Sequence, residues 1–392
     1  MAISNDIKNK MKASSFIRKM FEAGTQLKKE YGADRVFDLS IGNPDVEPPE
    51  AFKKALVDVA ASICPGKHAY MSNAGYSDVR KSVAEYVSKE QGVNLSCENV
   101  IMTCGAGGAL NTIFKTILNP GDNIITTAPC FVEYKFYAEN HGGSLEMVPV
   151  KNDFDLDIER MSEKISKKTA AVLINSPNNP TGKIYSRSTL NALGKMLERK
   201  SLEFKRTIYL LSDEPYRKIV FDGLVVPSVF TSYKNSIIAT SYSKDLSIPG
   251  ERIGYIALHP MAEDCGDLIN GMILSNRILG YVNAPAIMQR VVGRLQGCSV
   301  DIAVYEKKRD ILCRALSDMG YRLTKPGGTF YLFPHAPGGD DLEFVKILQK
   351  ELVLTVPGTG FGAPGYFRIA FCRDMRTIEG SIAGFKRAIS LF

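Results

Sequence analysis

Between residues 100 and 260, short apolar runs alternate with longer stretches in which apolar residues recur at helical spacing. Six runs rich in β-branched residues have the length of strands: 100–103, 123–127, 170–174, 207–211, 236–240 and 252–258. Strands that alternate with helices form β–α–β units around a mostly parallel sheet. The pattern therefore predicts an α/β fold whose mostly parallel sheet is flanked by helices.

The pattern changes after Pro285. A long helix is expected over 286–319, followed by a Gly-rich strand over 327–333 and helices near 341–351 and 376–390. At the amino end, residues 7–31 have the spacing of an amphipathic basic helix that ends at Gly32. We therefore predict two domains. A large α/β domain covers 45–285, and residues 1–44 with 286–392 form a smaller α+β domain.

Composition excludes several classes of protein. The chain has 392 residues, 45% of them hydrophobic and 23% charged, which is ordinary for a globular protein of two domains. The net charge of +7 is spread along the chain and does not by itself indicate nucleic acid. Eight cysteines without a CxxC pair and four scattered histidines favour neither a metal site nor a disulfide framework. Without a signal peptide or a membrane-spanning run, a cytoplasmic protein is expected.

The stretch Ser241–Lys244, with Arg252 shortly after it, carries the clearest chemistry. It follows the strand-like run 236–240, so the lysine lies where a buried strand ends. Hydroxyl and guanidinium groups bind phosphate, and a desolvated lysine amine can form a Schiff base with an aldehyde. Together these groups indicate pyridoxal phosphate. An ordinary exposed turn rich in Ser and Lys is the alternative interpretation.

Three other strand ends carry candidate groups, each with an ordinary structural explanation. The Gly-rich turn 103–110 opens a helix and could bind a phosphate or could serve close packing. The turn 178–182 offers two amides, although Pro180 and Gly182 alone would explain a turn. Asp213 could face a protonated pyridine nitrogen or could cap a helix.

The order of these features resembles that of the class I and II aminotransferases, fold type I of the pyridoxal phosphate enzymes, over nearly the whole chain. Residues 176–182 read SPNNPTG, which is similar to the family's motif without a departure. The lysine stretch 241–244 with 249–255 is likewise a close match. The resemblance implies a transaminase that works by a ping-pong mechanism on L-amino acids and 2-oxo acids. It also implies a homodimer with shared active sites.

The resemblance assigns roles residue by residue. Lys244 would hold the cofactor as a Schiff base and later carry the proton between the substrate's Cα and the cofactor. Asp213 would pair with the ring nitrogen, and Tyr216 would hydrogen-bond the ring's phenolic oxygen. The implied cofactor-binding residues are Gly105, Ala106, Gly107, Phe131, Asn179, Asp213, Tyr216, Ser241, Ser243, Lys244, Arg252 and, toward the neighbouring subunit's phosphate, Tyr70. Arg368 would clamp the substrate's α-carboxylate, with Gly42 and Asn179 beside it.

Substrate identity stays open at this point. Aspartate is the best single expectation for the donor, and aromatic, alanine and branched-chain donors are alternatives. Arg18, Arg277 and Arg290 are candidates for a distal carboxylate, although surface charge is the favoured interpretation of each. The chain has no tryptophan, so Phe131 is expected on the ring face.

Two other classes use related folds. A pyridoxal phosphate C–S β-lyase often has a histidine after the Asp–Glu pair, whereas this chain has Pro215–Tyr216, which favours transamination. A non-enzymatic regulator would need an amino-terminal DNA-binding domain, for which the residues before the predicted fold leave no room.

Overall fold

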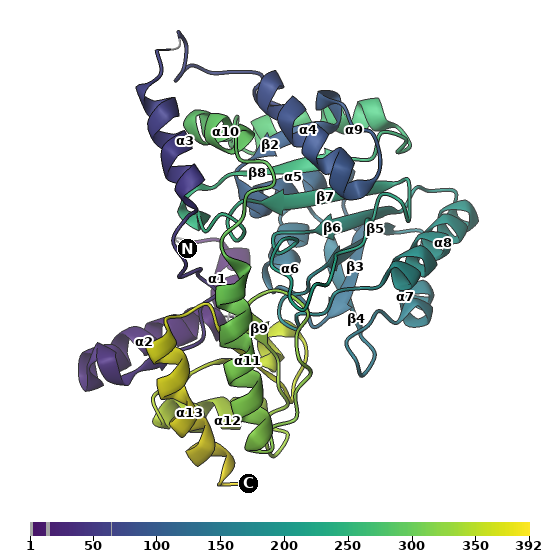
Figure 1. Cartoon of the computed structure of the whole chain (residues 1–392). Helices are drawn as coiled ribbons and strands as arrows, with labels where there is room; N and C mark the ends of the chain where they lie inside the picture. Colours follow the sequence, from purple (N-terminus) through teal and green to yellow (C-terminus); the bar gives the residue numbers. More distant parts are fainter. Residues whose placement is uncertain (1–2, 13–15, 64) are drawn as a thin grey trace.

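A computed structural model of the chain describes residues 3–12, 16–63 and 65–392, apart from the side chains of residues 12 and 16–22. A seven-stranded sheet with helices on both faces forms the larger part. A smaller unit, built from both ends of the chain, lies beside it (Figure 1). The α/β fold expected from the sequence is confirmed.

The central sheet has the strand order β2-β8-β7-β6-β5-β3-β4. Neighbouring strands run parallel except at β8, which is antiparallel to both β2 and β7. Its strands are β2 (Val100–Thr103), β3 (Asn123–Ala128), β4 (Ser144–Pro149), β5 (Thr169–Asn175), β6 (Tyr209–Asp213), β7 (Ser236–Ser241) and β8 (Gly254–Leu258). The sequence pattern missed β4, an edge strand whose side chains are mostly exposed or half-buried.

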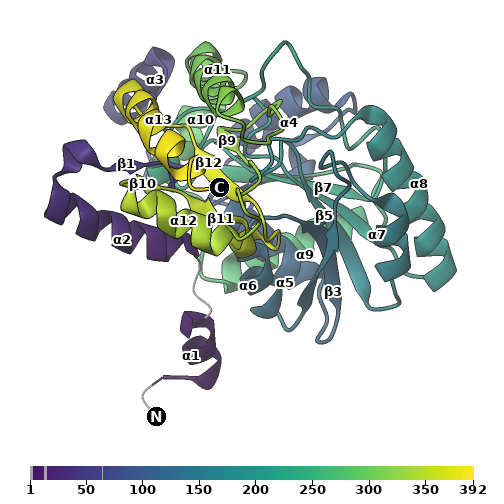
Figure 2. The same cartoon turned by 90° about the horizontal axis from the view of Figure 1, so that it is seen from below.

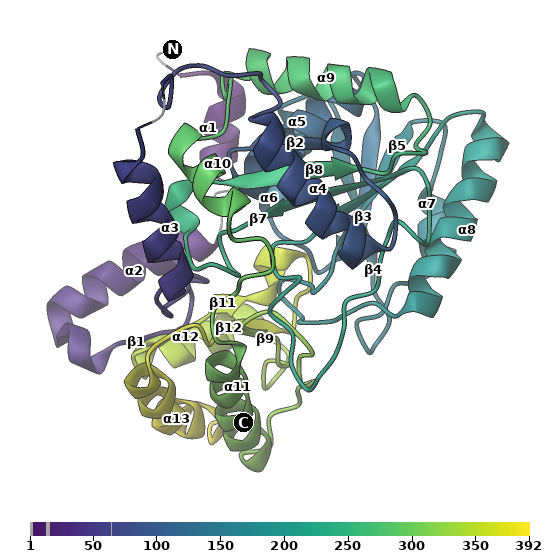
Figure 3. The same ribbon diagram turned by 45° about the horizontal axis from the view of Figure 1, so that its top comes forward.

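Both faces of the sheet are apolar because side chains alternate along each strand. On β5, Val172 and Ile174 belong to one buried cluster, and Ala171 and Leu173 belong to another on the opposite face. Helices cover both clusters: α4 and α10 contribute to the first and α5 and α9 to the second, and Figure 3 shows α4 in front of the sheet and α9 above it. The helices of this part are α3 (Glu50–Ala61), α4 (Ser77–Gln91), α5 (Gly105–Ile117), α6 (Glu133–Glu139), α7 (Ile158–Lys164), α8 (Arg187–Phe204), α9 (Cys265–Ile278) and α10 (Ala286–Gly293).

The smaller unit has its own buried core. Antiparallel strands β11-β12-β9 and the parallel pair β1-β10 form two small sheets. Figure 2 shows α12 and α13 packed beside these strands. Its elements are α2 (Phe16–Tyr31), β1 (Phe37–Asp38), α11 (Ile302–Asp318), β9 (Tyr331–Leu332), α12 (Asp341–Lys350), β10 (Val353–Leu354), β11 (Val356–Pro357), β12 (Phe367–Ala370) and α13 (Met375–Ile389). Helix α1 (Asn5–Lys12) stands apart from them in Figure 2, and its Lys10 forms an ion pair with Glu139 of α6.

Two expected helices differ from those observed. The helix expected over 7–31 corresponds to α1 and α2, and residues 13–15 between them lie outside the described part of the chain. The helix expected over 286–319 is wrong, since it consists of α10 and α11 separated by residues 294–301. Gly297 takes a positive φ of 85° in that segment, and the Asp301 side chain accepts the backbone N–H of Ala303 to begin α11.

The proposed border between the domains rests on where α10 packs. Met288, Val291 and Leu295 belong to the same cluster as Val172 of the central sheet. The division into two domains stays a prediction, and this packing favours a border after Leu295 rather than at residue 285.

The seven cysteines within the described residues are all free thiols. In the same part of the chain, no helix combines the length and the apolar character needed to cross a bilayer. Nor do the described His, Cys, Asp and Glu side chains gather in groups of three that could hold a metal ion.

Truncation inside the sheet tests this account of the core. Leu210 on β6 is fully buried, so we expect Leu210→Ala to lower the free energy of unfolding by about 2–5 kcal/mol. Leu202 on α8 is 76% exposed, and Leu202→Ala should change it by less than about 0.5 kcal/mol. Urea denaturation followed by circular dichroism measures both values. Equal losses in the two variants would contradict the assignment of Leu210 to the core.

Candidate active site

A cleft of about 310 Å³ lies at the carboxyl ends of the parallel strands. Twelve of the residues singled out from the sequence line it: Gly42, Ala106, Gly107, Phe131, Asn179, Asp213, Tyr216, Ser241, Ser243, Lys244, Arg252 and Arg368. Segments more than 300 residues apart in the chain thus meet in one place. The sequence alone showed only the order of these groups along the chain, and in the described structure they line the same cleft.

The sheet explains why these side chains meet. Asn175, Asp213 and Ser241 are the last residues of β5, β6 and β7. Asn175 is paired with Asp213 in the sheet, and Asp213 is paired with Ala239, so the three strands end close together. Ligands of open α/β sheets bind at this edge, where the loops leave the strands.

The amine of Lys244 is held near the Gly42 loop. Its Nζ donates a hydrogen bond to the Gly42 carbonyl at 2.9 Å and lies 5.5 Å from the centre of the Phe330 ring. Burial lowers the pKa of Lys244 to about 8, and the positive charges of Arg368 and Arg252 act in the same direction. At weakly alkaline pH, near 8, about half of this amine is therefore unprotonated and nucleophilic.

Asp213 presents one free carboxylate oxygen to the cleft. Its side chain is 95% buried, and Oδ2 accepts the hydroxyl of Tyr134 at 2.5 Å, while Oδ1 has no partner in the described structure. Burial raises the pKa of Asp213 to about 7, although the Tyr134 hydrogen bond opposes that shift. A cationic N–H donor opposite Oδ1 would offset the desolvation of this carboxylate, so the group fits a protonated heterocycle.

Arg368 is a buried cation without an anionic partner. The side chain is 2% exposed, and it donates to the Ser40 carbonyl at 2.8 Å and to Asn179 Oδ1 at 3.2 Å. Its Nε has no partner, and no carboxylate of the described residues forms an ion pair with it. Its guanidinium lies 4.4 Å from the centre of the Tyr331 ring. A buried guanidinium of this kind is suited to a carboxylate supplied by a ligand.

The opposite end of the cleft suits a phosphate. Helix α5 begins there, and Ala106 and Gly107 of its first turn line the cleft with Ser241 and Ser243. Gly105 does not line the cleft but is needed beside it. It has a φ of +72°, and a Cβ there would lie 2.9 Å from Nη2 of Arg252.

Among the polar side chains that line the cleft, four were missed from the sequence: Tyr134, Tyr137, Asn175 and Tyr331. Asn175 ties the amide turn to β6, because its Oδ1 accepts the backbone N–H of Asn179 and its Nδ2 donates to the Asp213 carbonyl. It is the last residue of a strand whose neighbour ends in a recognised acid, which was the available signal. No comparable signal marked Tyr134, which lies on α6.

Tyr331 explains why residue 42 is a glycine. A Cβ at Gly42 would lie 1.8 Å from the Tyr331 hydroxyl, so no larger residue fits. The same hydroxyl lies 3.2 Å from the hydroxyl of Tyr216. Gly42 was predicted as a point of close approach for the substrate, and the observed close approach is to Tyr331.

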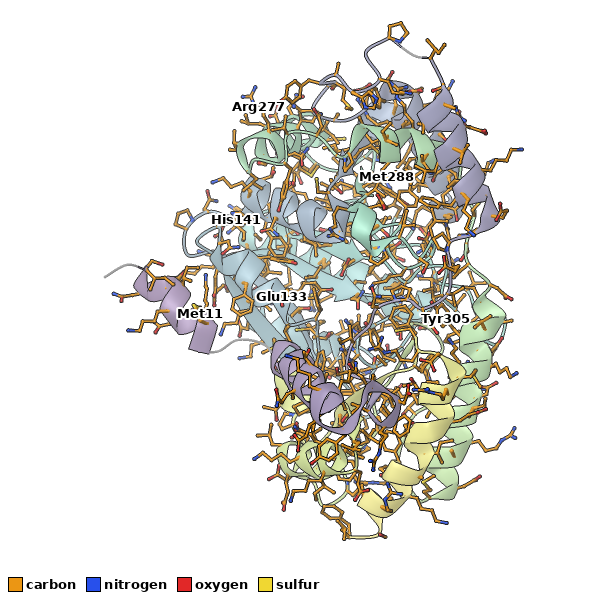
Figure 4. The ribbon with its side chains drawn as sticks, turned by 90° about the vertical axis from the view of Figure 1, so that its left-hand side faces the viewer. Met11, Glu133, His141, Arg277, Met288 and Tyr305 are labelled. Atoms are coloured by element: carbon orange, nitrogen blue, oxygen red, sulfur yellow. The ribbon has the colours of Figure 1, made fainter. Side chains whose placement is uncertain are left out.

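Four other residues singled out from the sequence lie away from this cleft or outside the description. Tyr70 is 89% exposed, and Arg277 lies on the outer surface at α9 (Figure 4). Arg290 stacks on the ring of Tyr76 at 4.0 Å. The side chain of Arg18 lies outside the described residues. A role for Tyr70 in a neighbouring subunit stays a prediction.

Comparison with known proteins identifies the family. The sequence profile described as "Aminotransferase class I and II" matches residues 34–383. The chain belongs to this family. It is 32% identical to a probable aspartate aminotransferase of Methanocaldococcus jannaschii, over 88% of this chain and 91% of that protein.

Solved structures agree with this assignment to the aminotransferases. A crystal structure of an aminotransferase from Eubacterium rectale superposes with a TM-score of 0.97 at 36% identity, covering 100% of this chain and 99% of the other. Aspartate aminotransferase of Thermus thermophilus gives a TM-score of 0.86 at 26% identity, covering 99% of this chain and 100% of the other. The prediction of a transaminase with this fold is confirmed.

The raised pKa of Asp213 predicts a pH-dependent effect on stability. Its folded value of about 7, against an ordinary 3.8, means that the stability linked to its proton is lost as pH rises toward 7. Asp213→Asn has no proton to lose there. Without added ligand, we expect the stability of this variant relative to wild type to increase by about 2–3 kcal/mol from pH 5 to pH 8.

Asp122→Asn is the matched control for this measurement. The hydrogen bond from Arg206 lowers the pKa of Asp122, so that carboxyl is ionised throughout the range from pH 5 to pH 8. The stability of Asp122→Asn relative to wild type should therefore stay constant. Urea denaturation at several pH values measures both profiles, and a flat profile for Asp213→Asn would contradict the burial argument.

Proposed function

We propose that this aminotransferase uses pyridoxal 5′-phosphate, bound through Lys244, to move amino groups between an L-amino acid and a 2-oxo acid. The observation that carries the proposal is the set of groups in one cleft. The cleft is lined by the amine of Lys244, whose pKa is lowered, and by Asp213, which has a free carboxylate oxygen. The first turn of α5 and Arg368, which has no anionic partner in the described structure, line it as well. Each matches a different part of the cofactor or the substrate.

The residues present fit that cofactor. Ser241, Ser243 and Arg252, with the first turn of α5, would hold the phosphate, and the free Oδ1 of Asp213 would accept the ring N–H. Phe131 would lie on the ring face. Asn179 and Tyr216 would bind the phenolic oxygen. When bound, the cofactor supplies an electron sink for the pair left at the substrate's Cα.

The chain's own groups would position the substrate and move its proton. Arg368 would hold the α-carboxylate and so orient the Cα–H bond toward the lysine. Once Lys244 is freed from the cofactor, its lowered pKa makes the Nζ atom an effective base for that proton. The same amine would hold that proton at Nζ and release it again, so one residue would serve as base and acid in both half-reactions.

Aspartate is the first donor to test, because the relative in Methanocaldococcus jannaschii and the solved Thermus thermophilus protein carry that activity in their names. Within the described cleft, the lining cations are Lys244, Arg252 and Arg368, all assigned to other tasks. A cation for a distal carboxylate would then come from outside this lining. A homodimer that shares its sites through Tyr70 and lies in the cytoplasm is part of the proposal.

Removal of Lys244 tests the cofactor assignment. The wild-type protein should develop a visible absorbance band with pyridoxal phosphate, and Lys244→Ala should form no such band and lose turnover by about a thousandfold or more. Lys53→Ala is the control, because that side chain lies on the exposed side of α3. Transamination by Lys244→Ala at a near wild-type rate would overturn the assignment.

The same band reports the donor range. Aspartate, alanine, phenylalanine and leucine are added one at a time, and a donor is recognised by the loss of the band together with release of its 2-oxo acid. Pyruvate and ammonia formed without an oxo-acid acceptor would instead indicate a lyase.

Replacement of Arg368 tests carboxylate binding. Loss of a charged hydrogen-bonded pair weakens binding by about 1.5–3 kcal/mol, so Arg368→Ala should raise KM for every amino acid by roughly tenfold to a hundredfold. Arg160→Ala is the matched control, since the Arg160 side chain is 61% exposed and pairs with Asp157 at the surface. Steady-state kinetics measure both. An unchanged KM in Arg368→Ala would remove that residue from the role.

A further inference from the structure

The segment that joins α10 to α11 is attached to the turn that carries Lys244. Figure 4 places Met288 of α10 in the larger part of the molecule and Tyr305 of α11 below it, and residues 294–301 connect the two helices. We call residues 294–301 the connector. Four hydrogen bonds tie it to the sheet side. The Tyr242 hydroxyl accepts from Gln296 Nε2 at 2.9 Å and donates to Gln296 Oε1 at 3.3 Å. Lys218 Nζ donates to the Cys298 carbonyl at 3.2 Å, and the Val300 N–H donates to the Asp245 carbonyl at 2.7 Å.

Lys218 contacts both sides of this junction. Besides the Cys298 carbonyl, its Nζ forms an ion pair with Asp245 Oδ2 at 3.0 Å. The two side chains are only 16% and 10% exposed. The ammonium also lies 4.8 Å from the centre of the Tyr86 ring. Since Asp245 directly follows Lys244, this pair fixes the peptide next to the lysine of the cleft.

The pair lies outside the cleft itself. Lys218 and Asp245 line a second cavity of about 20 Å³, large enough for a single water, which shares Pro215 and Ser241 with the cleft lining. Oδ1 of Asp245 has no partner in the described structure. The other charged or titratable side chains that line this cavity are Tyr86, Glu90, Glu214, Arg217, Tyr242 and Tyr255. Neither member of the pair therefore contacts the ligand space.

Helix α11 also reaches the acceptor of the Lys244 amine. Lys308 on α11 donates to Asp45 Oδ2 at 2.6 Å, three residues from the Gly42 carbonyl that accepts from Lys244 Nζ. Both the turn that carries the amine and the loop that accepts its hydrogen bond are thus fastened to the start of the smaller unit. A displacement of α11 acts on both.

We propose that Lys218 and Asp245 are positioning residues that lock the Lys244 turn to the connector, so that the position of α11 sets the position of the lysine amine. The inference rests on the proposed function, because it assigns a task toward the lysine of that site. A buried ion pair contributes little net stability, and in some proteins it selects one geometry of the segments that it joins. A displacement of about 1 Å at a reacting group costs up to a hundredfold in rate.

The alternative is that each charge merely neutralises the other. Three variants separate the two explanations: Lys218→Met, Asp245→Asn and the double variant. If the pair only neutralises its charges, each single variant loses stability and activity. The double variant then recovers both, because no buried charge is left alone. If the pair positions the turn, the double variant recovers its thermal stability, but the turn that carries Lys244 is no longer held in place.

Hydrogen exchange of the purified full chain without cofactor measures the turn directly. We expect Lys218→Met and the double variant to exchange at least about fivefold faster than wild type in two segments, 242–246 and the connector. The same variants, loaded with pyridoxal phosphate, should show kcat lowered about tenfold or more with KM within twofold of wild type.

Lys164→Met is the control, because Lys164 forms an ion pair of similar length with Glu146 at the surface and should change none of these values. Unchanged exchange in either segment, or a double variant with wild-type kcat, would overturn the inference. A wild-type chain that forms no absorbance band with pyridoxal phosphate contradicts the proposed function instead, and the exchange measurement still tests the lock.

Discussion

The cleft is built around buried charged side chains for which the described part of the protein supplies no counter-charge. Asp213 and Arg368 are almost fully buried, and neither forms an ion pair within the described residues. Such groups destabilise a folded chain unless a ligand completes them. Burial likewise raises the pKa of Asp213 and lowers that of Lys244, and the charge of Arg368 adds to the shift at Lys244. The cleft is therefore complementary to a ligand that carries a cationic N–H and a carboxylate or phosphate.

The sheet makes this arrangement possible. Because β5, β6 and β7 are parallel, they end at the same edge, where Asn175 pairs with Asp213 and β7 continues two residues beyond the partner of Asp213, Ala239. Apolar clusters on both faces hold those strands rigidly. The smaller unit then supplies Arg368 and Tyr331 from strands β12 and β9, so that the two parts close on one ligand space. At a sheet edge the backbone is fixed, so an unpaired charged side chain stays buried. On a flexible loop it would move out into solvent.

Sequence reasoning worked where a single local pattern carries the information. Apolar β-branched runs located six of the seven central strands, and strand-end motifs located Lys244 and Asp213. It failed where the decisive contact joins distant segments. Tyr134 acts on a carboxylate 79 positions away, and Tyr331 is recognised only by its approach to Gly42. The break between α10 and α11 was missed because the amphipathic spacing continues on both sides of a short polar stretch.

Strand alternation also explains how the cleft and the charged cavity behind it coexist. Neighbouring residues of an extended chain point to opposite sides. At the end of β6, Asp213 faces the cleft, whereas Glu214 turns to Ser212 and Arg217 and lines the second cavity. In the turn after β7, Lys244 and Asp245 also line different spaces, Lys244 the cleft and Asp245 the second cavity. Asp213 and Lys244 thus each have a buried charged neighbour, Glu214 and Asp245, which connects them to the rest of the fold. A change in the packing of the connector would therefore act on Lys244 through Asp245, the next residue in the chain, without any contact with the ligand.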